Sequence, residues 1–199
     1  MKNKFVMTPA QNRQFVRARL DDYLFASMVL ARYDVDEETC KDPEKMPEGE
    51  EKTALLNFQR AYDYLLNGYE EEADYEVLMK LHDILMDGLM DEQVNTLSEE
   101  QIAELNAMID QPAKANTEIA IDVMIHVLDK RLFKDGDVRA ALMFADKIMM
   151  DKGNGFITVS PALCKEFRTL LKQYNETKEG AAFKEWIYTN CVKGKKYYD

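Results

Sequence analysis

Two strongly apolar segments separated by a short charged stretch constrain this chain more than any other feature. The segments cover residues 119–128 and 138–145, and each is apolar at nearly every position. A helix that is apolar on all sides belongs in a protein interior. The sequence therefore predicts two buried central helices, with the charged stretch of residues 131–139 connecting them at one end of the core.

This connection has the chemistry of either a functional loop or an ordinary turn. Charged loops held on rigid buried helices commonly carry binding or catalytic residues. The free N–H groups at the start of the second helix favour anions. The guanidinium of Arg139 could bind a phosphate there, and the carboxylate of Asp135 could hold Mg²⁺. In the plainer interpretation Asp137 is an N-cap, Arg139 pairs with an acid, and the loop only joins two helices.

The rest of the sequence predicts helices along nearly the whole chain. Its 199 residues are enough for one domain that buries roughly 70% of its unfolded surface. The sequences that follow Thr8 and Ser98 fit capping boxes at two helix starts. Helical spacing of apolar residues predicts helices at residues 8–33, 52–67, 74–90, 98–109, 118–130, 138–152, 160–174 and 181–192. Because no confident strand pair is found, we predict an all-α single domain of about eight helices.

Composition divides the chain into three parts. Residues 1–51 are expected to form an N-terminal helix and a solvated loop, because nine acids lie between residues 34 and 51. Residues 52–192 are expected to form the helical core, and residues 193–199 a flexible tail.

Charge and cysteine usage narrow the classes of function. The net charge of −11 disfavours nucleic acid and anionic membranes as partners. No run of residues approaches the 18 apolar positions of a membrane span. The three cysteines are widely spaced and form no CxxC pair, which favours a reducing cytoplasm over a disulfide framework.

A polar stripe follows one face of the first central helix. Glu118, Asp122, His126 and Lys130 recur at every fourth position. Such a row of carboxylates, imidazole and cation could be functional, but more often it is the face that a buried helix keeps in water.

The residues around the charged connection resemble the Fic/Doc family. Residues 81–85 read LHDIL, residues 133–139 read FKDGDVR about fifty positions later, and an aromatic segment follows at residues 183–187. Members of that family are all-helical and carry the pattern HxFx(D/E)GNGRxxR on the loop between two central helices. Most transfer AMP from ATP to a hydroxyl of a target protein, and Doc-type members transfer phosphate. The resemblance covers residues 52–191 and implies a Fic-like fold, in which the two central helices are antiparallel and residues 131–139 form the motif loop.

Four positions match the family pattern. The resemblance implies that Phe133 is the buried motif phenylalanine, Asp135 the Mg²⁺ ligand, Gly136 the first glycine and Arg139 the arginine that grips phosphate. Together with Asp137, these residues would contact ATP and Mg²⁺ if nucleotide binding is retained.

Four other positions depart from the pattern. Arg131 stands at the place of the catalytic histidine, and arginine cannot act as a base because it stays protonated. Asp137 replaces the motif asparagine and puts a carboxylate where phosphates would lie. Val138 replaces the second glycine, and Leu142 replaces the final arginine. The segment of residues 91–97 also lacks the pattern of the β-hairpin flap that docks targets in active members.

We therefore expect a Fic-like cytoplasmic protein with a degenerate active site, which lacks AMP-transferase activity and acts as a binding or regulatory protein with a protein partner. One alternative is an active transferase of AMP or phosphate, with Asp135 and Asp137 binding metal and Asp122 or Glu118 as base. Another is a plain helical interaction module with a coincidental motif. The sequence leaves the partner and the oligomeric state open.

Overall fold

The protein is mostly helical, which confirms the predicted all-α class. A computed structural model describes residues 1–68, 71–90 and 97–196. Within these ranges the α-helices are α1 (Pro9–Arg17), α2 (Leu20–Leu30), α3 (Glu37–Lys41), α4 (Glu50–Asn67), α5 (Tyr75–Met86), α6 (Glu99–Ile109), α7 (Asn116–Lys130), α8 (Asp137–Asp151), α9 (Cys164–Thr177) and α10 (Gly180–Asn190). Short 3-10 helices cover Pro43–Lys45 and Pro161–Leu163. None of the helices in the described ranges combines the length and apolarity needed to cross a membrane.

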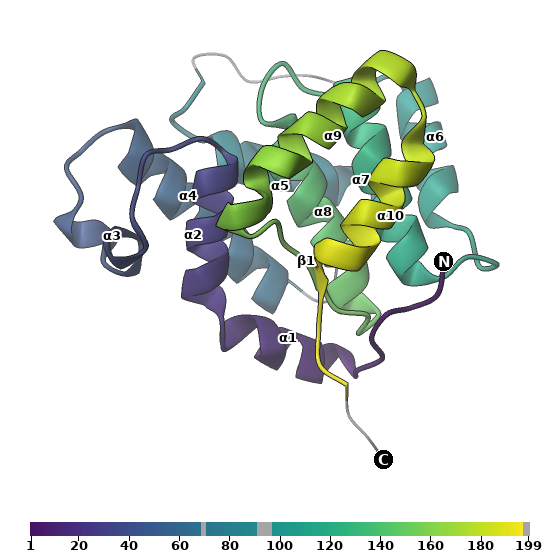
Figure 1. Cartoon of the computed structure of the whole chain (residues 1–199), viewed down its shortest axis with the longest axis horizontal. Coiled ribbons are helices and arrows are strands. Elements are labelled where there is room, and N and C mark those ends of the chain that lie inside the picture. The colour runs from purple at the N-terminus through teal and green to yellow at the C-terminus, as the bar shows by residue number, and fades with distance from the viewer. Residues whose placement is uncertain (69–70, 91–96, 197–199) are drawn as a thin grey trace.

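The two central helices are α7 and α8, and they pack against each other through the middle of the molecule (Figure 1). Helix α8 also contacts α1, α4 and α5, so neighbours surround it on several sides. Its central residues from Ala140 to Met150 are almost all buried, which is why this segment is apolar around its whole circumference. The prediction of a buried central pair is confirmed.

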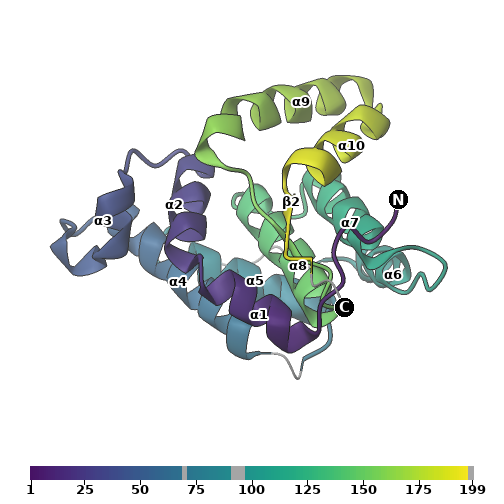
Figure 2. The same ribbon diagram turned by 60° about the horizontal axis from the view of Figure 1, so that its bottom comes forward.

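The predicted single helix over residues 8–33 is wrong, because the chain breaks between α1 and α2. Helix α1 begins with the predicted capping box of Thr8 and faces the end of α8, where Arg13 pairs with Asp151 at 3.1 Å. Helix α2 instead packs against α4 (Figure 2). The chain turns at Arg19, whose φ of −136° is not helical, because a straight helix could not make both sets of contacts.

The acidic segment that follows is also more ordered than predicted. Asp36 caps α3 by accepting a hydrogen bond of 2.7 Å from the Thr39 N–H. Only Cys40 of this helix is buried, and α3 projects from the body of the molecule beside α2 (Figure 1). Its surface remains solvated, as nine nearby acids require.

A small sheet corrects the expectation that no strands pair. Strand β1 (Phe156–Ile157) pairs antiparallel with β2 (Val192–Lys193). Phe156 is fully buried and stacks on Tyr23 with ring centroids 4.7 Å apart. The first residue of the expected C-terminal tail, Lys193, thus lies in a strand.

The turn after α8 ties the N-terminal segment to the core. Gly153 has φ +68°, and a Cβ there would lie 1.9 Å from the Met7 carbonyl oxygen, so glycine is required. The Met7 N–H donates to the Gly153 carbonyl at 2.8 Å. The Asn12 side chain donates to the Gly155 carbonyl at 2.9 Å and accepts from its N–H at 2.7 Å.

Candidate functional site

The motif loop leaves α7 at Arg131 and enters α8 at Gly136. Both residues have left-handed backbone conformations, with φ values of +47° and +82°. Phe133 is buried, whereas Arg131 and Asp135 are exposed. The loop therefore turns one face into the core and another toward solvent.

His82 of α5 holds the buried face of the loop. Its ring stacks on Phe133 with centroids 3.8 Å apart and 6° between the planes. Its Nε2 lies 2.9 Å from the Asp135 carbonyl oxygen, so Nε2 carries the proton and donates it. His82 is thus a packed, hydrogen-bonded helix histidine. The ring therefore contacts the loop both through its face and through Nε2.

Gly136 suits the backbone of the loop where it approaches α5. Its φ of +82° is left-handed, and a Cβ at this position would lie 2.7 Å from the sulfur of the flexible Met86 side chain. The left-handed backbone selects glycine without any reference to a bound phosphate.

The plainer interpretation of the sequence expected Asp137 to be the N-cap of α8, but it is not. Gly136 is the N-cap, and Asp137 is the first residue of the helix. Its carboxylate turns back and accepts a hydrogen bond of 3.0 Å from the Phe133 N–H. Burial raises the pKa of the Asp137 carboxyl to about 6, although the Phe133 N–H and Arg131 act in the opposite direction. The group is thus mainly charged at neutral pH, at the helix end where an anion would bind.

Arg139 lies beside the loop but is engaged elsewhere. Its guanidinium donates to the Tyr33 hydroxyl at 3.0 Å and lies 5.2 Å from the centre of that ring. It also approaches the Met86 sulfur at 3.6 Å. The side chain expected to grip phosphate therefore links the start of α8 to the segment after α2.

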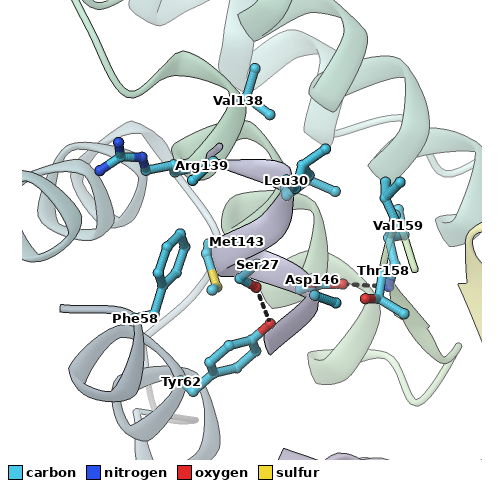
Figure 3. Close-up of a pocket in the computed structure, with 14 residues that line it drawn as sticks. Ser27, Leu30, Phe58, Tyr62, Val138, Arg139, Met143, Asp146, Thr158 and Val159 are labelled. Carbon is cyan, nitrogen blue, oxygen red and sulfur yellow. Dashed lines mark hydrogen bonds between the residues drawn. The ribbon is translucent and has the colours of Figure 1, made fainter. Parts of the chain in front are cut away.

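A small pocket lies beside Arg139 (Figure 3). Its volume of about 20 Å³ has room for one water molecule. Tyr62 and Ser27 share a hydrogen bond of 2.9 Å on one side. On another side Asp146 accepts from the Ile157 N–H at 2.6 Å, and burial raises the pKa of this carboxyl. The pocket is too small for a nucleotide and belongs to the core.

An open pocket of about 440 Å³ lies on the solvent side of the loop. Residues from the end of α2, the motif loop and α9 line it. Four of its lining side chains are cationic, namely Arg32, Arg131, Lys134 and Arg139. Its acids are Asp135 and Asp137. Five of the six site residues predicted from the sequence border this pocket, and the sixth, Phe133, faces the core.

The motif loop offers two carboxylates, Asp135 and Asp137, and both accept hydrogen bonds within the loop. The Asp135 carboxylate accepts from the Gly136 N–H at 2.6 Å. The Asp137 carboxylate and the Val138 side chain stand at the start of α8, where phosphates would approach its free N–H groups.

The polar stripe of α7 divides into two groups of ion pairs. Glu118 and Asp122 both pair with Lys184 of α10, at 3.1 and 2.5 Å. At the other end Lys130 pairs with Glu104 of α6 at 3.2 Å. Glu118 lies 13 residues before Arg131, or roughly 20 Å along the helix. It is therefore too far from the loop to serve as its base, and the closer Asp122 is held by Lys184.

Tyr33 and Arg32 border the loop but were not singled out from the sequence. They follow α2, which is far from the loop along the chain, so no local pattern marks them. Of the predicted truncated flap at residues 91–97, residues 91–96 lie outside the described residues.

The arrangement of helices matches solved structures of Fic proteins. Fic-1 (residues 134–508) from C. elegans superposes with a TM-score of 0.74 over 90% of this chain, at 14% sequence identity. The chain has a Fic-like fold. A Fic domain containing signaling protein from Bacteroides thetaiotaomicron is also similar, with a TM-score of 0.62 at 11% identity, over 85% of this chain and 76% of that chain.

The likeness to Fic proteins is one of fold. No protein-family model and no curated protein matches the sequence. This Fic-like chain spans 62% of that C. elegans chain, which itself covers residues 134–508 of Fic-1. The predicted Fic-like architecture is confirmed, with the motif residues on the loop between the central helices.

Proposed function

We propose that this Fic-like protein lacks AMP-transferase activity and acts as a binding or regulatory protein for a protein partner. The supporting observation is the missing base. Arg131 stands where the family has its histidine, and a guanidinium cannot accept a proton near neutral pH. His82 donates its Nε2 proton to the loop, and His126 faces Glu104 of α6.

Three of the four matching residues have structural roles that explain them without catalysis. Phe133 stacks on His82, Gly136 permits the left-handed turn beside α5, and Arg139 binds Tyr33. The departures include Arg131 at the place of the base and Asp137, which puts a carboxylate where phosphates would lie. This pattern is what we expect of a loop that keeps its shape after its chemistry is lost.

Incubation of the protein with α-labelled ATP, Mg²⁺ or Mn²⁺ and a cell lysate tests the proposal. We expect no more labelling of any protein than with the Asp135→Ala variant. Strong labelling that disappears with Asp135→Ala would overturn it.

We place the protein in the cytoplasm, a proposal supported by the free state of Cys40, Cys164 and Cys191.

The alternative is a nucleotide-dependent transferase of AMP or phosphate with altered catalytic residues. The open, partly cationic pocket beside the loop favours this alternative. It requires ATP with Mg²⁺ to raise the melting temperature, and that gain to disappear in Arg139→Ala. The absence of any gain would exclude it.

A further inference from the structure

We propose that a cleft between the end of α2 and helix α9 binds an acidic segment of the partner protein. This inference rests on the proposed binding function and names the chemistry of the partner. The cleft has a volume of about 820 Å³ and continues from the open pocket at the motif loop, because Arg32 and Arg131 line both. Figure 2 shows the start of α9 beside the end of α2.

The cleft is cationic in a strongly acidic protein. Its lining holds one acid, Glu176, and five cations, namely Arg32, Arg131, Lys165, Arg168 and Lys172. Of these, Arg32, Arg131 and Lys165 form no ion pair with any residue that the structure describes. Lys172 reaches Glu176 only at 3.8 Å, and Glu176 is exposed. A concave surface lined by one sign of charge concentrates ligands of the opposite sign.

The three cations of α9 form a row along one wall. Lys165, Arg168 and Lys172 recur at helical spacing and therefore share one face, over roughly 10 Å. The Arg168 guanidinium also donates to the carbonyls of Val29 and Leu30, at 2.8 and 3.2 Å. These bonds fix α9 against the end of α2, so the row has a defined position.

An extended acidic peptide is long enough to follow this row. Alternate side chains of an extended chain lie roughly 7 Å apart on one face, against roughly 5 Å along the helix axis between successive cations, and the flexible lysine and glutamate side chains take up the difference. The lining also has an apolar part, formed by Leu30, Val138, Phe167 and Leu171. The side chains between the acids would pack on it or face solvent. A long nucleic acid is a poorer match, because the chain as a whole carries a net charge of −11.

Fluorescence anisotropy with a labelled hexaglutamate peptide tests the site on the full-length protein. We expect saturable binding that weakens about tenfold in the Lys165→Glu/Lys172→Glu variant. Two exposed ion pairs between lysine and peptide carboxylate are lost there, and repulsion between carboxylates replaces them. The matched control is Lys2→Glu/Lys152→Glu, which changes the net charge equally at exposed positions outside the cleft and should leave binding unchanged. Binding should also weaken with added salt.

Three outcomes would overturn the inference. The first is an equal loss of binding in both double variants, which would indicate a general charge effect. The second is tighter binding of a labelled oligothymidylate than of hexaglutamate, which would assign the cleft to nucleic acid. The third is self-association in sedimentation that Lys165→Glu/Lys172→Glu abolishes, which would assign it to a second copy. ATP labelling reports separately on the proposed function, so either idea can fail alone.

Discussion

The imidazole of His82 lies flat against the ring of Phe133, with the two ring centres 3.8 Å apart. The same imidazole donates a hydrogen bond to the carbonyl of Asp135. A residue of α5 therefore fixes the loop between α7 and α8 from inside the protein. The contact gives the loop a defined shape that does not depend on a ligand.

Two replacements of His82 should separate the contribution of its hydrogen bond to stability from that of its ring stack. We expect His82→Phe to lower the free energy of unfolding by about 1 kcal/mol, because the stack remains and the hydrogen bond is lost. We expect His82→Ala to lower it by about 2–3 kcal/mol, because the stack is lost as well. Urea denaturation measures both, with the exposed neighbour in Asp83→Ala as control. Equal values for the three variants would contradict a structural role for His82.

Asp137 should make stability depend on pH in a particular direction. Its pKa of about 6 in the folded protein lies above the ordinary value of 3.8, so the folded state holds the proton more tightly. Stability from this group is present below about pH 4 and is lost as the pH rises through about 6. The Asp137→Asn variant keeps an oxygen for the Phe133 N–H but cannot ionise.

Between pH 4 and pH 7, the free energy of unfolding of Asp137→Asn should rise by about 1 kcal/mol relative to that of the natural protein. The full shift would be worth more, but solvent screens this partly exposed carboxyl. Denaturation at both pH values measures the difference, and other titrating groups cancel in the comparison. A difference between the two proteins that is constant with pH would show that Asp137 has an ordinary pKa.

The left-handed conformation of Arg131 gives a third prediction. A side chain costs about 1 kcal/mol in this region of φ and ψ, and glycine avoids that cost. Arg131→Gly should therefore be more stable than Arg131→Ala by about 1 kcal/mol, although both remove the same charge. Thermal unfolding of the pair measures this, and the reverse order would show that the loop is not held at φ +47°.

A double-mutant cycle should detect the contact between Arg139 and Tyr33. We expect Arg139→Met and Tyr33→Leu to be coupled by about 1 kcal/mol, since a hydrogen bond and a cation–π contact join the two residues. Chemical denaturation of the two single variants and the double variant gives the coupling. Additive effects would mean that the guanidinium is free to serve the open pocket.

The sequence predicts the helices and the place of the loop because both depend on local patterns. The capping boxes at Thr8 and Ser98 form as their residues indicate. The break at Arg19 and the pairing of Phe156 with Lys193 are not predictable in this way, because contacts between distant parts of the chain decide them. Two-residue strands are also too short to show a period of two.

The same distinction between local patterns and long-range contacts applies to the candidate site. The resemblance to Fic proteins brings the motif residues to one loop, but it says nothing of what their side chains contact. Arg139 binds a hydroxyl 106 residues away in the sequence. The cationic cleft likewise joins the end of α2 to α9, so neither segment alone indicates it.

The turn at Gly153 has a consequence for how the chain folds. It receives Met7 and Asn12 from one end of the chain, and Gly155 lies against Lys193 from the other. During synthesis these contacts cannot all form until nearly the whole chain has left the ribosome. Because such long-range contacts form slowly, we expect the last step of folding to be the closure of both ends over α8.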